Sequence, residues 1–435
     1  MDLTGVLILT FTFTILLALG VPVAFSIGLS SMLTMMLSME GLPAVTTLAQ
    51  RMATGLDSFA LLAIPFFVLA GQFMNRGGIA NRLIDFAQVF VGRLPGGLAF
   101  VNIIACMLFG AISGSAVAAA SAIGGFMAPR MVKEGYDKAF SAAVNITSST
   151  TGMIIPPSNI LIVYSLASGG VSIAALFVAG YIPGILLGLT LMIIAGIIAY
   201  RRKYPLVEKM SFVQMLKKAV DALPSMLLLV IVIGGIVAGV FTATEASAVA
   251  VLYTMFLSMV VYKEVKIKDL PQIFLETVAT TAVVLILIGV SIGMSWVMSY
   301  ENIPQAVSKA LLGLSNNLIV ILLIINLILL FVGIFMDMTP AVLIFTPIFL
   351  PVVTQLGMHP IHFGMVMTMN LCIGLCTPPV GSVLFVGCSV AKISLDKVLK
   401  PMLPLFVGML IALLLTTYVP AFSLWLPEWF GLLKK

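Results

Sequence analysis

Two apolar stretches of this chain are interrupted by a glycine and, a few residues later, by a pair of prolines. The first reads Ser148-Ser149-Thr150-Thr151-Gly152-Met153-Ile154-Ile155-Pro156-Pro157-Ser158-Asn159, and the second reads Gly374-Leu375-Cys376-Thr377-Pro378-Pro379-Val380-Gly381-Ser382. A proline inside a helix removes a backbone donor and clashes with the preceding turn, so paired prolines stop a helix. The sequence therefore predicts a broken helix at each stretch.

The two breaks belong to a longer internal repeat with a fixed offset. Gly152 and Gly374 are 222 residues apart, and so are the two proline pairs. The same offset, without a gap, pairs further residues: Phe109 with Phe331, Ile112 with Ile334, Ala119 with Ala341, Pro129 with Pro351 and Gly135 with Gly357. Chance alignment of common residues is the alternative, but ungapped matches at the breaks favour a true repeat.

Composition indicates that these breaks lie inside a membrane. Of the 435 residues, 61% are hydrophobic and only 9% are charged, whereas soluble domains carry roughly 25% charged residues. This balance excludes an ordinary soluble enzyme, a disordered tail and a nucleic-acid-binding protein. A membrane-spanning helix needs about 20 apolar residues, and we expect spans at 4–20, 22–39, 58–76, 139–167, 174–200, 223–242, 245–262, 274–298, 363–391 and 401–426.

Two further apolar regions, 97–129 and 317–355, each break near the middle. Their second pieces, 117–129 and 341–355, are too short to cross a bilayer at ~1.5 Å per residue. We therefore interpret both regions as re-entrant hairpins, which enter and leave the membrane on the same side.

The basic residues predict the orientation of the chain, because they gather on the cytoplasmic side of membrane proteins. If the N-terminus faces the periplasm, the external segments contain only four of the 22 basic residues: Arg51, Lys309, Lys434 and Lys435. The first half then starts outside and the second half starts inside, so the repeat is inverted. Inverted repeats with broken helices are typical of secondary transporters, whose binding site lies near the middle of the membrane.

The hairpin tips and the breaks are the candidate sites. Lipid cannot satisfy broken backbone, so the breaks must face protein or a wet cavity, where carbonyls bind cations and N–H groups bind anions. The first tip reads Ser113-Gly114-Ser115-Ala116, and the break that follows contains Thr151 and Gly152. Hydroxyl and carbonyl oxygens are the ligands that hard cations use. A single Ser or Thr in a membrane helix, however, more often bonds its own backbone.

The second tip reads Met336-Asp337-Met338-Thr339-Pro340. Asp337 is the only formally charged residue between Lys309 and Lys392, and an ionisable group at that depth is a functional candidate by default. A nearby monovalent cation would keep it ionised; the alternative is a carboxylate that caps a helix without any ion. Thr339 before Pro340 is a suitable N-cap and N1 pair for the returning helix.

Several short runs across the chain match one known family: Leu61-Leu62-Ala63-Ile64-Pro65-Phe66-Phe67, Met74-Asn75-Arg76-Gly77-Gly78, Leu94-Pro95-Gly96-Gly97, Ser113-Gly114-Ser115-Ala116-Val117-Ala118, Gly135-Tyr136-Asp137, Ile154-Ile155-Pro156-Pro157-Ser158, Thr244-Glu245-Ala246 and Gly374 to Val380. Through these runs nearly the whole chain resembles the large membrane subunit, of the DctM type, of tripartite ATP-independent periplasmic (TRAP) transporters. The resemblance implies an all-α, inverted-repeat elevator transporter of the bacterial inner membrane. In such a protein, a transport domain of hairpins and broken helices slides against a scaffold.

The resemblance also implies partners and cargo. The partners are a small four-helix membrane subunit and a periplasmic substrate-binding protein, and the coupling ion is sodium. The substrate is an organic acid, such as a C4-dicarboxylate or the sialic acid N-acetylneuraminate. Carried over by position, the expected sodium ligands are Ser113, Gly114, Ser115, Thr151, Gly152, Asp337, Met338, Thr339, Gly374 and Thr377. The expected substrate residues are Ser115, Ala116, Ser158, Asn159, Thr339, Gly381 and Ser382.

The expected domain order follows the repeat, with amphipathic arms at 78–92 and 300–314 along the membrane interface. The domains are 1–92, scaffold helices and first arm; 93–173, first hairpin and broken helix of the transport domain; 174–222, a scaffold helix and a basic cytoplasmic linker; 223–314, scaffold helices and second arm; 315–400, second hairpin and broken helix of the transport domain; and 401–435, a C-terminal helix.

Two other classes of function stay open. A channel, or an anion and sodium symporter that needs no binding protein, would give flux through the membrane part alone. An intramembrane enzyme ranks last, because Asp337 has no second intramembrane carboxylate and no histidine at helical spacing. The sequence also lacks a phosphate-binding loop, a nucleophile elbow and a cluster of metal ligands, so we expect no ATP hydrolysis and no transition metal.

Overall fold

The computed structural model describes residues 3–206 and 211–433, and within these ranges it contains twenty α-helices and no β-strand. Lys434, Lys435 and residues 207–210 of the predicted basic linker lie outside the described residues. The helices of the first half are α1 (Leu3–Ala18), α2 (Val23–Ser38), α3 (Gly41–Leu56), α4 (Ala63–Arg76), α5 (Ile79–Val91), α6 (Gly97–Ser113), α7 (Ala116–Lys133), α8 (Lys138–Ser149), α9 (Asn159–Ala167) and α10 (Ile173–Arg201).

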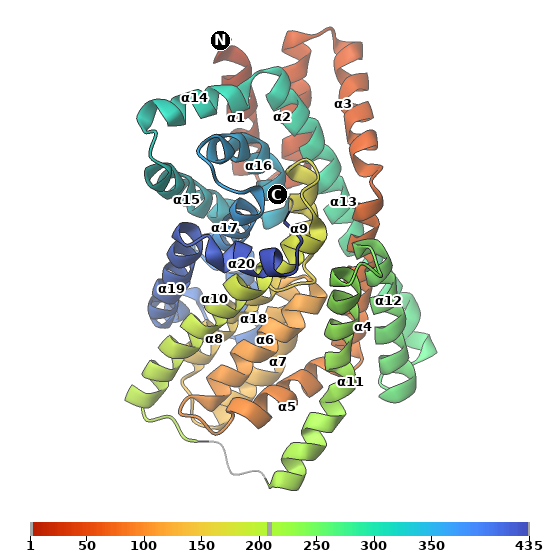
Figure 1. Cartoon of the computed structure of the whole chain (residues 1–435), viewed down its shortest axis with the longest axis vertical. Coiled ribbons are helices and arrows are strands. Elements are labelled where there is room, and N and C mark those ends of the chain that lie inside the picture. Colours follow the sequence, from red (N-terminus) through yellow and green to blue (C-terminus); the bar gives the residue numbers. More distant parts are fainter. Residues whose placement is uncertain (1–2, 207–210, 434–435) are drawn as a thin grey trace.

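The second half continues in the same pattern, coloured green to blue in Figure 1. Its helices are α11 (Phe212–Val237), α12 (Ala243–Phe256), α13 (Leu270–Tyr300), α14 (Ile303–Leu314), α15 (Leu318–Phe335), α16 (Met338–Gln355), α17 (Pro360–Gly374), α18 (Ser382–Ala391), α19 (Leu395–Tyr418) and α20 (Ala421–Trp429).

Helix boundaries confirm the repeat. Both ends of α7 reappear in α16 at an offset of 222 residues, and α8, α10, α17 and α19 begin at matching positions. α13 contains the whole counterpart of α4 and the C-terminal part of the counterpart of α3. One continuous helix of the second repeat thus corresponds to two helices of the first. The sequence prediction missed α3, because Thr46, Thr47, Gln50 and Arg51 make this helix too polar to be recognised as a membrane span.

The two breaks form as the prolines predict. α8 stops at Ser149 and α9 starts at Asn159; α17 stops at Gly374 and α18 starts at Ser382. Each gap contains a cis peptide bond between its paired prolines.

The hairpins form, but the length argument for them was wrong. α7 and α16 contain 18 residues each, several more than the predicted pieces. Eighteen residues extend about 27 Å, close to the ~30 Å hydrocarbon core, and both α15 and α16 are long and apolar enough to span a membrane. That the hairpins are re-entrant follows instead from the position of their tips. Both tips line one internal cavity, although their hairpins start from opposite ends of the molecule.

The arms show this inversion directly. α5 precedes the first hairpin and α14 precedes the second, and Figure 1 shows them at opposite ends of the molecule. Both are amphipathic: Ile79, Leu83 and Ala87 are buried on α5, and Ile303 and Leu311 are buried on α14. Opposite placement of equivalent arms is what an inverted repeat requires.

Two sets of helices pack among themselves. One contains α2, α3, α4, α12 and α13; the other contains the hairpins and broken helices together with α10 and α19. The two sets also touch, because α13 packs against α16 and α4 packs against α6. The sequence prediction assigned 174–200 to the scaffold, whereas α10 packs against α6, α17 and α19. α10 also lies against the first break, where a side chain at Gly180 or Gly184 would collide with Ile154 or Ile155. Which helices move during transport stays a prediction.

Glycines hold each break against its own hairpin. A Cβ atom added to Gly110 of α6 would lie 2.9 Å from the Cα of Gly152, and one added to Gly333 of α15 would lie 3.0 Å from the Cα of Gly374. In the reverse direction the approach is closer still: a Cβ atom added to Gly374 would lie 2.6 Å from the Cα of Gly333, and one added to Gly152 would lie even nearer to the Cα of Gly110. Real Cβ atoms essentially never come within 3.0 Å of a neighbour. The backbones of hairpin and break therefore touch in both repeats, and only glycine fits between them.

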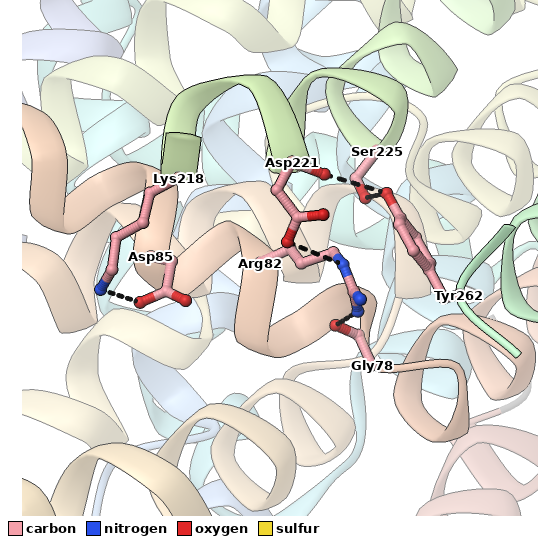
Figure 2. Close-up of polar contacts among 7 residues, drawn as sticks. All are labelled: Gly78, Arg82, Asp85, Lys218, Asp221, Ser225 and Tyr262. Atoms are coloured by element: carbon pink, nitrogen blue, oxygen red, sulfur yellow. Dashed lines mark hydrogen bonds and ion pairs between the residues drawn. The ribbon is translucent and has the colours of Figure 1, made fainter. Parts of the chain in front are cut away.

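The N-terminal part of α11 holds the first arm through polar contacts, which Figure 2 shows. Lys218 Nζ lies 2.6 Å from Asp85 Oδ1, and Arg82 Nε lies 3.2 Å from Asp221 Oδ2. The Arg82 guanidinium also lies over the ring of Tyr262, 3.5 Å from its centroid. The second arm is held differently, because α14 packs mainly against α16 of its own hairpin.

We expect Gly152→Ala to lower the melting temperature of the purified protein, because overpacking at a tight contact costs about 1–3 kcal/mol. Gly125→Ala is the control for adding a methyl group to a glycine, since Gly125 lies within α7 and a Cβ there meets open space. Equal melting temperatures for the two variants, measured in the same detergent, would show that the contact does not constrain the fold.

Candidate functional site

The two hairpin tips and the two breaks meet in one cavity of about 630 Å³. Nine of the residues predicted as ligands line it: Ser113, Gly114, Ser115, Ala116, Asn159, Asp337, Met338, Thr339 and Ser382. The cavity runs along α7 as far as Ser121 and along α13 from Val284 to Glu276. It therefore extends from the tips toward the end of the molecule at which α5 lies.

The other predicted residues lie behind this surface, within the breaks. Thr151 Oγ1 donates to the carbonyl of Ser148 at 2.6 Å, and Thr377 Oγ1 donates to the carbonyl of Ile373 at 2.8 Å. Ser158 donates its hydroxyl to the carbonyl of Met153.

The remaining three predicted residues are glycines at which backbones approach closely. Gly152 and Gly374 contact Gly110 and Gly333, as described above, and Gly381 lies against the carbonyl oxygens of Leu375 and Thr377. The sequence thus predicted the right neighbourhood, but local backbone turns decide which groups reach the cavity.

The first tip leaves two buried oxygens without a hydrogen-bond partner. They are Ser113 Oγ and Asn159 Oδ1, and Asn159 begins α9 directly beside the turn at Gly114. Gly114 has a φ of +61°, which glycine adopts at no steric cost, and this turn reverses the chain between α6 and α7. Ser115 uses its hydroxyl to cap α7 by accepting from the N–H of Ala118 at 3.2 Å. Unpaired oxygens next to a helix break fit a cation, which needs acceptors and no donors.

The second tip presents a carboxylate. Asp337 is the counterpart of Ser115 in the repeat and is likewise the N-cap of its helix, but it accepts from the N–H of the next residue, Met338, at 2.8 Å. The prediction that Thr339 is the N-cap was therefore wrong: the helix starts one residue before it. Asp337 is nevertheless exposed to the cavity, so capping and cation binding are compatible.

Neither α9 nor α18 has a side-chain cap at its N-terminus, because Ser158 bonds Met153 and Gly381 has no side chain. Helix N-termini carry a partial positive charge and N–H groups without a partner in their own helix. At α18 one of these is already paired, because the N–H of Val383 donates to the carbonyl of Leu375 at 3.2 Å. Two such termini beside the cavity are suited to an anion, next to oxygens that are suited to a cation.

Sequence reasoning missed the opposite wall of the cavity. Gln72 and Asn75 of α4 and Glu276 and Thr280 of α13 line it. Their signal was the spacing of three or four residues, which puts each pair on one helix face. These residues stand near the ends of apolar segments, where polar residues are common, so the spacing alone did not single them out.

An inverted repeat with broken helices, whose polar ends share one cavity, defines a secondary transporter. The chain belongs to the family of the tripartite ATP-independent periplasmic transporter, DctM component, whose model matches residues 10–422. It is the large permease of such a transporter, a multi-pass protein of the bacterial inner membrane and not an enzyme. The resemblance seen in the sequence is thereby confirmed.

Individual relatives agree over nearly their full length. YgiK of Salmonella typhimurium is 55% identical, over 98% of both chains. The C4-dicarboxylate TRAP transporter large permease protein DctM of Pseudomonas aeruginosa is 41% identical, over 94% of this chain and 95% of the relative. The solved YdaH transporter of Alcanivorax borkumensis shares the fold, with a TM-score of 0.64 at 14% identity, covering 90% of this chain and 89% of that chain.

We expect Ser121→Cys to react with a membrane-impermeant maleimide in inside-out vesicles but not in right-side-out vesicles. The reason is that Ser121 is exposed at the part of the cavity nearest the predicted cytoplasmic end. The four native cysteines are buried, so background labelling is low. Thr368→Cys is the control, because Thr368 is fully buried. Labelling from the opposite side only would reverse the predicted orientation.

Proposed function

We propose that the protein imports an organic anion together with sodium, and that a periplasmic binding protein delivers the anion. One observation carries the proposal: oxygens suited to a cation and helix N-termini suited to an anion surround the same cavity, at breaks that the repeat duplicates. Cation and anion can therefore bind side by side, which is the physical requirement for coupling their movement.

The first sodium would bind between the first tip and the first break. Ser113, Gly114 and Ser115 supply hydroxyl and carbonyl oxygens from the tip, and Thr151 and Gly152 supply them from the break. The unpaired Ser113 Oγ supports this assignment, because burying a hydroxyl without any partner is costly. Thr151 donates its proton to a carbonyl and keeps lone pairs for a cation.

A second sodium would bind between the second tip and the second break. Asp337, Met338 and Thr339 would supply ligands from the tip, and Gly374 and Thr377 from the break. The Asp337 carboxylate gives this site a formal negative charge. The site thus differs from the first, where the repeat has Ser115 at the same position.

The anion would bind between the tips, contacting Ser115, Ala116, Ser158, Asn159, Thr339, Gly381 and Ser382. Names of relatives indicate the class of compound. A Vibrio cholerae relative, 40% identical, is named a sialic acid transporter subunit. An Oleidesulfovibrio alaskensis relative is named for isethionate, and an Escherichia coli relative for 2,3-diketo-L-gulonate. Together with C4-dicarboxylates, these compounds share a negative charge and a small polar body.

Transport would follow an elevator movement of the hairpin bundle against α2–α4, α12 and α13. We propose that α10 and α19 move with the hairpins, because they pack against them. A small four-helix membrane subunit would complete the fixed part, and the N-terminus would face the periplasm.

The test is uptake into proteoliposomes that contain the complete transporter. We expect uptake of a radiolabelled C4-dicarboxylate or N-acetylneuraminate only with an inward sodium gradient and the cognate binding protein. Uptake without a sodium gradient would contradict coupling. Uptake without the binding protein would instead favour the alternative, a binding-protein-independent symporter or channel.

Two substitutions test the sodium sites through the rise in melting temperature that sodium causes. Ser113→Ala removes a hydroxyl with no hydrogen bond, and Asp337→Asn removes a charge while keeping a side chain that caps helices equally well. A tenfold weaker site loses about 1.4 kcal/mol of sodium-dependent stabilisation at high sodium. Ser423→Ala is the matched control, since Ser423 Oγ is also buried and unpaired but lies on α20, outside the cavity. An unchanged sodium effect in both test variants would refute these ligands.

A further inference from the structure

Two groups of opposite charge meet beside the cavity, on the wall that faces the hairpin tips. Arg76, the last residue of α4, pairs with Glu276 of α13. Gln272 Nε2 donates to the same Glu276 oxygen at 2.9 Å. The side chains of Arg76 and Glu276 are 34% and 36% exposed, so water and solutes reach the pair.

The charges that line the cavity are both negative. Among the described residues that line it, Glu276 and Asp337 are the only charged ones, and none is a lysine, arginine or histidine. An organic anion in this space therefore meets two carboxylates. Among the ion pairs found in the described part of the chain, the one with Arg76 alone brings a cation to a cavity-lining residue.

We propose that Arg76 is a second anion-binding group of the transporter, which exchanges the Glu276 carboxylate for the acidic group of the substrate. The proposal rests on the proposed function, because it takes the substrate to be an organic anion. A guanidinium presents parallel N–H donors that match a carboxylate or a sulfonate. A partly exposed ion pair is weak, so an anion can compete with Glu276 for Arg76. Gln272 keeps a hydrogen bond to Glu276 after Arg76 has left.

The position of Arg76 determines when it acts. Arg76 and Glu276 lie on α4 and α13, whereas the proposed substrate ligands lie on the hairpin tips and breaks. Arg76 therefore meets the anion only while the cavity is open at the end near α5. In that state Glu276 competes with the anion for Arg76 and keeps the affinity for the anion low. Release of the anion is therefore favoured over its retention.

The experiment measures anion affinity on the full chain in lipid nanodiscs, by calorimetry in sodium buffer. The probes are succinate, N-acetylneuraminate, 2,3-diketo-L-gulonate and isethionate, and the one that the unaltered protein binds is used for all variants. Glu276→Gln frees Arg76 and should lower the Kd roughly three- to fivefold, whereas Arg76→Gln should raise it by a similar factor. The double variant should have a Kd close to that of the unaltered protein and not below it. The reason is that Glu276→Gln lowers the Kd below this value only when Arg76 is present.

Arg51→Gln is the control for loss of an arginine, since Arg51 lies over the ring of Trp296 and does not line the cavity. It should leave the Kd unchanged. If both single variants lower the melting temperature but neither changes the Kd, the pair is only structural and the inference fails, while the proposed function stands. A weaker affinity in Glu276→Gln would also overturn it. If none of the four anions binds the unaltered protein, the proposed function fails and this inference fails with it.

Discussion

A helix that stops inside a membrane leaves backbone groups that lipid cannot satisfy, and the fold is arranged to cover two such stops. Each is pressed against its own hairpin by a contact between glycines, Gly110 with Gly152 and Gly333 with Gly374. α10 closes the first stop from outside, where its glycines admit Ile154 and Ile155. Hairpin, broken helix and covering helix therefore form one packed unit in the first repeat.

The same constraint explains the chemistry of the cavity. Hydroxyl groups within the breaks bond nearby carbonyls, as with Thr151, Ser158 and Thr377. Two side-chain oxygens that lack a partner, Ser113 Oγ and Asn159 Oδ1, lie at and beside the first tip. A substrate carboxylate would be repelled by Asp337, and a sodium ion between them turns that repulsion into attraction. In the proposed function, this charge balance is sufficient to couple the movement of sodium to that of the substrate.

The repeat and the breaks could be predicted from the sequence because they depend on proline and glycine, whose backbone effects are local. The hairpins were predicted from lengths that the helices exceed, and it is the position of their tips in the fold that makes them re-entrant. α3 could not be predicted, since its polar residues conceal a helix that tertiary contacts with α13 stabilise. For the site, the sequence predicted the region but not the role of each residue. Asp337 caps α16 where Thr339 was expected to, and Glu276 was overlooked because nothing local distinguishes it from a charge at a helix end.

The anchoring of the first arm makes the two repeats mechanically unequal. α11 starts well before position 225, which corresponds to Leu3 at the start of α1, and its extra turns carry Lys218 and Asp221. α5 thus touches both α11 and its own hairpin helix α6, whereas α14 touches mainly α16. In the proposed elevator movement, a rigid displacement of the hairpins would separate α5 from one of these two neighbours, and the ion pairs to α11 are the contacts that water can replace. The α14 arm, which packs mainly on its own hairpin, would keep most of its contacts. Under that movement, the pseudo-twofold relation of the fold would not extend to the two arms.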